Sequence, residues 1–164
     1  MADANALKTP TDLNSNATKT VTQALNAILA DSFALYLKTK NFHWHVSGPH
    51  FRDYHLMLDE QASEILGSTD GIAERVRKIG NVTLHSIGDI ARHQTIRDND
   101  EEFVPAADML SELRDDNLKL VESLREAKEI ADAAKDNGTS ALIDELTDAA
   151  EKRAWFLFET GRKG

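Results

Sequence analysis

Residues 18–48 read TKTVTQALNAILADSFALYLKTKNFHWHVSG, and the helical spacing of this stretch decides the fold class. Its apolar side chains recur at steps of three and four residues, at Val21, Leu25, Ile28, Leu29, Leu35 and Phe42. That spacing puts them on one face of an α-helix, which we expect to begin at Thr18. The helix should stop at Gly48-Pro49, because glycine can cap a helix and proline cannot continue one.

The same spacing predicts three further long helices on the C-terminal side of this stretch. Proline suits the first position of a helix, where its missing N–H has no helical partner. Threonine and serine can cap a helix, because their hydroxyl oxygens accept from free backbone N–H groups. We expect the second helix at about 51–79, ending at Gly80-Asn81. The third should run from Pro105 to a break at Asn137-Gly138. The fourth should be capped by Thr139 or Ser140 and should run to about Thr160.

The remaining segments are a tail and one long connection. Residues 1–17 are polar and contain Pro10, so we expect a flexible N-terminal tail. Residues 82–100 are less regular and are expected to hold one short helix around Ile87–His93. The pattern therefore predicts an all-α fold, with one domain at 18–161. This domain is a four-helix bundle with a short extra helix in the connection between helices two and three.

Composition narrows the classes of function. The 164 residues include no cysteine, which excludes disulfides, thiolate zinc sites and cysteine nucleophiles. The formal net charge of -9 argues against general nucleic-acid affinity, which depends on neutralising phosphates. No apolar run approaches the roughly 20 residues of a membrane-spanning helix, and the N-terminus lacks the apolar segment of a signal peptide. We therefore expect a cytoplasmic protein.

Two pairs of metal-binding side chains lie along the predicted second helix. His55 and Asp59 are four residues apart, as are Asp70 and Glu74, so each pair projects from one face. Asp59 and Asp70 are 11 residues apart, close to three turns, so both pairs point in broadly the same direction. The pairs are nevertheless separated by roughly 16 Å along the helix, whereas metal–ligand bonds measure only about 2.0–2.5 Å. The two pairs on one helix therefore cannot bind the same metal ion.

A second copy of this helix, antiparallel across a two-fold axis, would bring Asp70 and Glu74 of one chain against His55 and Asp59 of the other. Two equivalent sites would result. Imidazole with carboxylate suits ferrous iron or a similar first-row ion, and excludes neither zinc nor manganese. An ordinary solvated charged face fits the same residues, so both interpretations stay open here. No histidine has a glutamate three positions before it, which disfavours a di-iron centre inside one bundle.

Residues 41–51 (NFHWHVSGPHF), His55, Leu58-Asp59 and residues 70–75 (DGIAER) form one specific pattern. In these residues the chain resembles the Dps family of miniferritins, over roughly residues 17–158. The resemblance implies a ferritin-like four-helix bundle, assembled as a shell of twelve identical subunits with iron sites at two-fold interfaces.

By matching position, the resemblance assigns His43, His55 and Asp59 of one chain to the same site as Asp70 and Glu74 of its mate. It implies that His43, His55, Asp59 and Glu74 bind iron directly. Asp70 either binds iron directly or acts through a water molecule or a supporting hydrogen bond.

The implied activity is that of a ferroxidase, an oxidoreductase acting on metal ions. Two Fe²⁺ ions are oxidised by hydrogen peroxide, or more slowly by dioxygen, and the product is stored as ferric mineral that protects against oxidative damage. Trp44 would lie beside the site and absorb a stray oxidising equivalent. Iron would enter through acidic pores near the start of the fourth helix. Asp136, Asp144 and Asp148 are candidates for these pores, with an ordinary acidic helix face as the alternative.

Many Dps proteins bind DNA through lysine-rich tails, and here the chain departs from the family. The first 17 residues hold Lys8 against Asp3 and Asp12, and the C-terminus offers only the basic residues 162–163. So few phosphate contacts predict no tight DNA binding at physiological salt. The alternative function is a nucleoid-associated DNA-binding and DNA-protecting protein in which the iron chemistry is secondary. A further alternative is a helical scaffold without catalysis.

Overall fold

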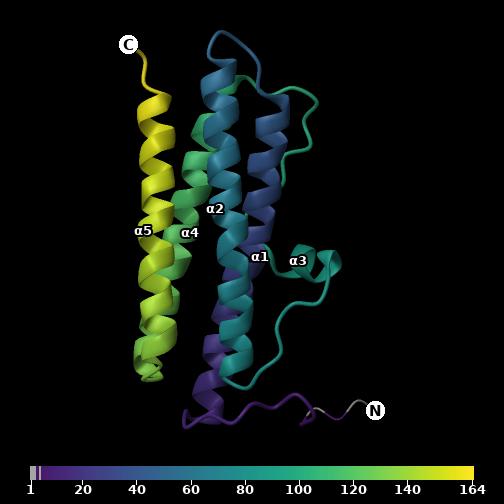
Figure 1. Cartoon of the computed structure of the whole chain (residues 1–164), viewed down its shortest axis with the longest axis vertical. Coiled ribbons are helices and arrows are strands. Elements are labelled where there is room, and N and C mark those ends of the chain that lie inside the picture. Colours follow the sequence, from purple (N-terminus) through teal and green to yellow (C-terminus); the bar gives the residue numbers. More distant parts are fainter. Residues whose placement is uncertain (1–2, 4) are drawn as a thin grey trace.

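The computed structural model describes residue 3 and residues 5–164, and every regular element in that part of the chain is a helix (Figure 1). The elements, in chain order, are α1 (Ser15–His45), α2 (Phe51–Lys78), α3 (Ile87–His93), α4 (Ala106–Ala133) and α5 (Asn137–Thr160). The predicted all-α bundle is confirmed, as is the short helix α3 between the second and third long helices. Among the described residues, no helix is long and apolar enough to cross a membrane.

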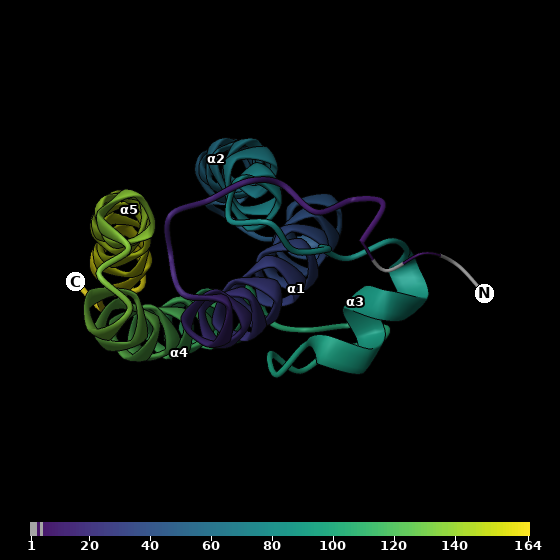
Figure 2. The same cartoon turned by 90° about the horizontal axis from the view of Figure 1, so that it is seen from below.

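The four long helices form two antiparallel hairpins, α1–α2 and α4–α5 (Figure 1). The hairpins pack with α1 against α4 and α2 against α5, and α3 lies outside the bundle beside α1 (Figure 2). Each long helix buries one apolar stripe, as the spacing predicts. The core between the stripes includes Leu25 and Leu35 from α1, Leu58 and Ile72 from α2, Leu113 and Leu124 from α4, and Ile143 and Leu157 from α5.

The first helix begins earlier than predicted. α1 starts at Ser15 rather than Thr18, because the side chain of Asn14 caps it by accepting hydrogen bonds from the backbone N–H groups of Asn16 and Ala17. Its last helical residue is His45, shortly before the predicted stop at Gly48. Asparagine is among the best capping residues, so the local signal was present in the sequence.

The start of the last helix was also predicted wrongly. The cap is Asp136, whose carboxylate accepts from the backbone N–H of Thr139, rather than Thr139 or Ser140. Asn137 and Gly138 therefore lie in the first turn of α5 and do not form the break between α4 and α5. The reversal between α4 and α5 occurs at Lys135, which adopts a φ of 58°.

The long connection between α2 and α4 is held against α1 by a buried carboxylate. Asp31 accepts hydrogen bonds from the backbone N–H of Thr95 at 2.6 Å, from the Thr95 hydroxyl at 2.7 Å and from the backbone N–H of Ile96 at 2.9 Å. Lys38, also buried in α1, donates to the backbone oxygen of Arg97 at 2.8 Å. These contacts fix the connection on the outer side of α1, where α3 lies.

The segment before α1 runs across the end of the bundle where α2 finishes (Figure 2). Arg77 donates to the backbone oxygen of Leu7 at 2.6 Å, and Leu13 packs against the core. Gly80 has a φ of 93°, and a side chain there would come within 2.9 Å of the backbone oxygen of Thr9. Residues 1, 2 and 4 of the predicted tail lie outside the described residues, and flexibility of the whole segment 1–17 stays a prediction.

Candidate metal centre

Two histidines stack on each other where α1 ends and α2 begins. The ring centroids of His43 and His55 are 3.8 Å apart and the rings are nearly parallel. Nδ1 of His43 lies 2.6 Å from the backbone oxygen of His55, and Nδ1 of His55 lies 2.8 Å from the backbone oxygen of His43. A carbonyl oxygen only accepts, so each ring donates from Nδ1, and in the neutral form of the ring the lone pair then lies on Nε2. Both imidazoles are therefore oriented as metal ligands usually are.

Asp59 lies near the two histidines, one turn further along α2. Its Oδ1 atom lies 3.8 Å from Nε2 of His43 and 2.7 Å from Nζ of Lys40. The hydrogen bond from the Lys40 ammonium is the main cause that lowers the pKa of Asp59 below its usual value. The carboxylate is thus ionised and can bind a metal cation, although the ammonium group of Lys40 already pairs with it.

Sequence reasoning missed Lys40. The lysine precedes His43 by three residues on α1, a spacing that places both on one face of the helix. Its Nζ atom also lies 5.9 Å from the ring centroid of Trp44. Helical spacing alone could have placed Lys40 beside the histidine, but its pairing with Asp59 depends on how α1 packs against α2.

The other two predicted ligands lie elsewhere on α2. Asp70 and Glu74 are both exposed, and neither joins a side-chain hydrogen bond or ion pair within the described part of the chain. No group of three or more histidine, aspartate, glutamate or cysteine side chains is placed to hold a metal ion among the described residues. One chain therefore gathers His43, His55 and Asp59, a partial ligand set, and leaves Asp70 and Glu74 apart.

Apolar side chains are exposed around this partial set. Trp44 is 58% exposed and Leu37, two turns earlier on the same face of α1, is 57% exposed. The ring of Phe51 is 45% exposed and stacks on His55 with centroids 5.0 Å apart. Exposed apolar groups clustered on one face usually mark a contact surface. His45 is exposed as well, and its Nδ1 atom is bound to Asn41 at 2.8 Å.

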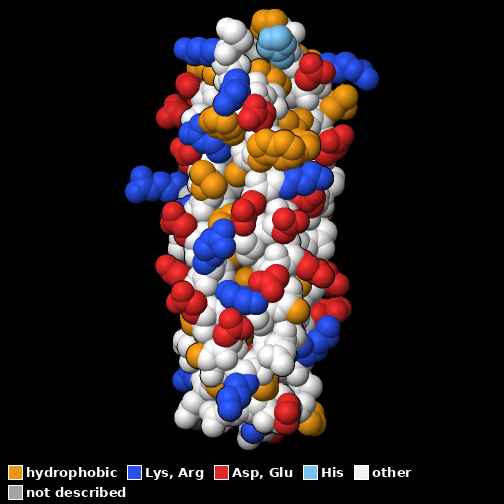
Figure 3. Space-filling view, turned by 90° about the vertical axis from the view of Figure 1, so that its left-hand side faces the viewer, with side chains coloured by type: hydrophobic (Ala, Val, Ile, Leu, Met, Phe, Trp, Pro, Cys, Tyr) orange, Lys and Arg blue, Asp and Glu red, His pale blue; other side chains and the backbone are white. Residues whose placement is uncertain are grey.

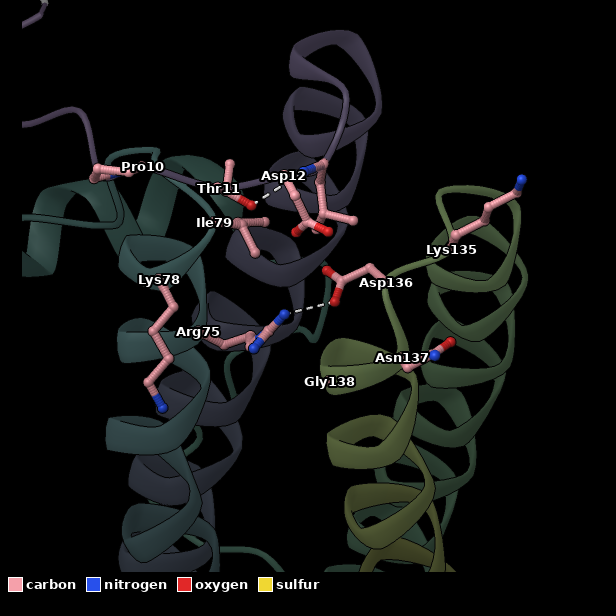
Figure 4. A pocket seen from close by; sticks show the side chains of 11 residues that line it. Pro10, Thr11, Asp12, Arg75, Lys78, Ile79, Lys135, Asp136, Asn137 and Gly138 are labelled. Carbon is pink, nitrogen blue, oxygen red and sulfur yellow. Dashed lines mark hydrogen bonds and ion pairs between the residues drawn. The ribbon is translucent and has the colours of Figure 1, made fainter.

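The pore candidates are not equivalent. Asp136 is only 2% exposed and pairs with Arg75 at 2.6 Å (Figure 4). Its carboxylate also accepts from both the hydroxyl and the backbone N–H of Thr139. Its carboxylate caps a helix and has no surface for a passing ion, so its assignment to a pore was wrong. Asp144 is exposed but pairs with Lys128 at 2.8 Å, and Asp148 is exposed.

Residues 22–162 match the family model of the ferritin-like domain. The chain is 34% identical over 133 residues to a DNA protection during starvation protein from Brevibacillus brevis, covering 81% of this chain and 89% of that protein. The solved structure of Dps from Thermosynechococcus elongatus superposes with a TM-score of 0.88 at 29% identity, covering 92% and 95% of the two chains.

A Dps protein from Vibrio cholerae O1 gives a TM-score of 0.88 at 25% identity, covering 96% of this chain and 99% of that one. It is described as a member of a broad superfamily of ferritin-like diiron-carboxylate proteins. The matches in sequence and in fold extend over nearly the whole bundle. The chain therefore belongs to the Dps family of ferritin-like proteins.

Proposed function

We propose that this protein is a ferroxidase and an iron-storage protein. It oxidises Fe²⁺ with hydrogen peroxide, or with dioxygen, at sites shared by two subunits, and it stores the ferric product inside a dodecameric shell in the cytoplasm. One observation carries the proposal: His43 and His55 present free Nε2 atoms next to the ionised carboxylate of Asp59. Two imidazoles with carboxylates form a ligand set suited to iron.

We call His43, His55 and Asp59 of one chain the half-site. A second copy of the chain supplies the carboxylate ligands that the half-site lacks. Because Asp59 and Asp70 are 11 residues apart on one straight helix, an antiparallel copy of α2 places Asp70 and Glu74 opposite the histidines of its mate. Two-fold symmetry then produces two equal sites. The same pairing covers Leu37 and Trp44, whose exposure supports a contact on this face.

The residues act by binding and by balancing charge. Three carboxylates supply three negative charges, which offset three of the four positive charges of two Fe²⁺ ions and half of the six positive charges of the two Fe³⁺ ions formed, while the two imidazoles serve as nitrogen ligands. The two ions give one electron each to peroxide, which takes up two protons and leaves as two molecules of water. Paired transfer avoids the single-electron step that releases hydroxyl radical. Trp44 lies next to Lys40 at the edge of the proposed iron site. Its ring is the group that would donate an electron to a radical formed by incomplete reduction of the oxidant.

Iron enters, in this proposal, through an acidic surface on α5. Asp148 is exposed, and Asp144 lies one turn before it. Asp144 can contribute only when an arriving cation displaces the ammonium of Lys128. Asp148 is therefore the stronger pore candidate.

The experiment that tests the proposal loads the protein with Fe²⁺ without oxygen and then adds peroxide, with absorbance recording the formation of Fe³⁺. The wild type should oxidise iron rapidly and keep the product dissolved in a particle far larger than one chain. His55→Ala/Asp59→Ala should lose the fast reaction. If both proteins match the protein-free control, the proposed function is wrong.

DNA protection is the second candidate, supported by the names of relatives such as the Brevibacillus brevis protein. The net charge of -9 and the few basic residues in the tails oppose it. We expect no tight, sequence-independent shift of DNA by the intact shell in a gel at moderate salt. A tight shift that disappears when the tails are deleted would favour the nucleoid-associated function instead.

A further inference from the structure

A hydroxyl group is directed at the sulfur atom of Met57, where α2 packs against the end of α5. Oγ1 of Thr160, the last residue of α5, donates to this sulfur at 3.5 Å. Met57 is partly buried and packs against the core. A thioether sulfur is a weak acceptor, so the contact contributes little to stability as it stands. The same hydroxyl is placed to donate much more strongly to an oxygen atom carried by that sulfur.

Met57 lies between two members of the half-site on α2 but faces away from them. His55 precedes it by two residues and Asp59 follows it by two, and side chains two positions apart on a helix do not face each other. The Met57 sulfur instead contacts α5. Its chemistry is therefore separate from that of a metal bound at the half-site.

Met57 carries the most accessible sulfur atom in the described part of the chain. The chain has no cysteine, and the other described methionine, Met109, is 1% exposed in the core. Met57 lies near the C-terminal end of α5, and hydrophobic side chains gather over this part of α5 in the upper half of the face (Figure 3). Hydrogen peroxide is uncharged, so the net charge of -9 does not keep it from this surface.

We propose that Met57 is a modification site at which hydrogen peroxide oxidises the thioether to a sulfoxide, and that the Thr160 hydroxyl then donates to the sulfoxide oxygen. A lone pair of the sulfur attacks one peroxide oxygen, and the S–O bond forms as the O–O bond breaks. The sulfur gives up two electrons, and the second oxygen leaves as hydroxide and takes the proton of the transferred oxygen to become water.

The modification goes beyond the proposed function because it needs peroxide and no metal. Each chain removes one molecule of peroxide at Met57, also when no iron is bound. Sulfoxide formation usually disrupts a core because it turns an apolar side chain into a polar one. Here the Thr160 hydroxyl satisfies the new oxygen, so the bundle keeps its fold, and reduction by methionine sulfoxide reductases restores the thioether.

The test treats the intact, metal-free protein with hydrogen peroxide in the presence of a chelator, which prevents the formation of radicals by iron. Mass spectrometry of peptides then follows the oxygen gained by each methionine. Met57 should be oxidised at least about tenfold faster than Met109, which reacts only when the core opens locally. Circular dichroism should show the same fold after oxidation. The matched control Met57→Leu, a volume-conserving replacement, should gain no oxygen in this peptide and should keep the wild-type Tm.

Thr160→Val tests the part given to the hydroxyl, with Thr160→Ala as a second variant if the first does not fold. Oxidation should lower the Tm more in Thr160→Val than in wild type, because the sulfoxide oxygen then lacks its donor. Equal decreases in Tm would overturn the role of Thr160, and oxidation of Met57 no faster than that of Met109 would overturn the modification site. A wild type that does not oxidise iron but gains oxygen at Met57 supports this site and refutes the proposed function alone.

Discussion

Arg153 places a guanidinium inside the bundle, where it is only 6% exposed, and replacing it by methionine tests how the interior is stabilised. Its Nε atom donates to Oδ1 of Asn117 at 2.8 Å, and its Nη1 atom donates to Glu64 at 2.5 Å. Burial is the main cause that lowers the pKa of Arg153. Methionine retains much of the apolar stem and removes the charge together with both hydrogen bonds.

The expected cost follows from the exposure of the two partners. Asn117 is 1% exposed, so its orphaned side-chain oxygen costs about 1–3 kcal/mol. The side chain of Glu64 is 43% exposed and returns to water at a cost of about 0–1 kcal/mol. Loss of a buried cation offsets part of the sum, which leaves a decrease of about 2 kcal/mol in the free energy of unfolding. For a chain of this length, that corresponds to a Tm lower by about 4–8 °C.

The assay is thermal unfolding of wild type, Arg153→Met, Asn117→Leu and the double variant at equal subunit concentration, because assembly makes the Tm depend on concentration. Arg153→Met/Asn117→Leu has no orphaned oxygen and should regain about half of the lost stability. Iron oxidation per folded chain should be unchanged, since the proposed site lies at a subunit interface. An unchanged Tm in Arg153→Met, or no recovery in the double variant, would refute this account of the interior.

Four further variants test other parts of the structure. Lys40→Met is expected to raise the affinity for Fe²⁺ up to about fivefold in an oxygen-free titration, because Asp59 loses the ammonium that holds it at 2.7 Å. Burial raises the pKa of Asp116 in the folded protein above the ordinary value of 3.8. The folded state therefore binds this proton more tightly than the unfolded state, and Asp116 stabilises the fold increasingly as the pH falls through its folded pKa towards 3.8. Asp116→Asn lacks that contribution, so its Tm should decrease more steeply than that of wild type over this pH range. Gly138→Ala should cost about 1–3 kcal/mol, because a Cβ there meets a guanidinium nitrogen at 2.6 Å, whereas Gly67→Ala, in open space, should stabilise by about 0.5–1 kcal/mol.

Equal or weaker Fe²⁺ binding by Lys40→Met would show that the lysine does not compete for Asp59. Parallel curves of Tm against pH for Asp116→Asn and wild type would remove the role given to that carboxyl. A Gly138→Ala protein as stable as Gly67→Ala would show that the Arg75 guanidinium can make room for a side chain at this position.

Much of the fold was predictable because helix formation leaves a local signal. The periodic apolar residues predicted all four long helices, α3 was placed at Ile87–His93 as observed, and α5 ends at Thr160 as expected. The start of α5 was wrong because Asp136, Thr139 and Ser140 are all good caps. The choice among them depends on Arg75, a distant residue on α2 that pairs with Asp136.

The site was predictable only in part, because contacts between distant residues leave no local signal in the sequence. The four-residue spacing of His55 and Asp59 indicated a metal-binding pair, whereas His43 entered through the family resemblance. The stacking of His43 on His55, and the pairing of Lys40 with Asp59, depend on the register between α1 and α2. Asp136 was a pore candidate because the family resemblance implies acidic pores near the start of the fourth helix, and tertiary structure buries it.

Each iron site is proposed to be built from two chains, and shells that mix two variants provide a direct test of this arrangement. His55→Ala/Asp59→Ala and Asp70→Asn/Glu74→Gln are prepared separately and also co-expressed in equal amounts, and iron oxidation by peroxide is measured for each preparation. Alone, each variant should be inactive. In mixed shells half of the two-fold pairs hold both variants, and each such pair has one site with every ligand intact. We expect co-expression to restore about a quarter of the wild-type activity per chain. Mixed shells as inactive as the separate variants would contradict it, because sites built within one chain cannot be rescued by another.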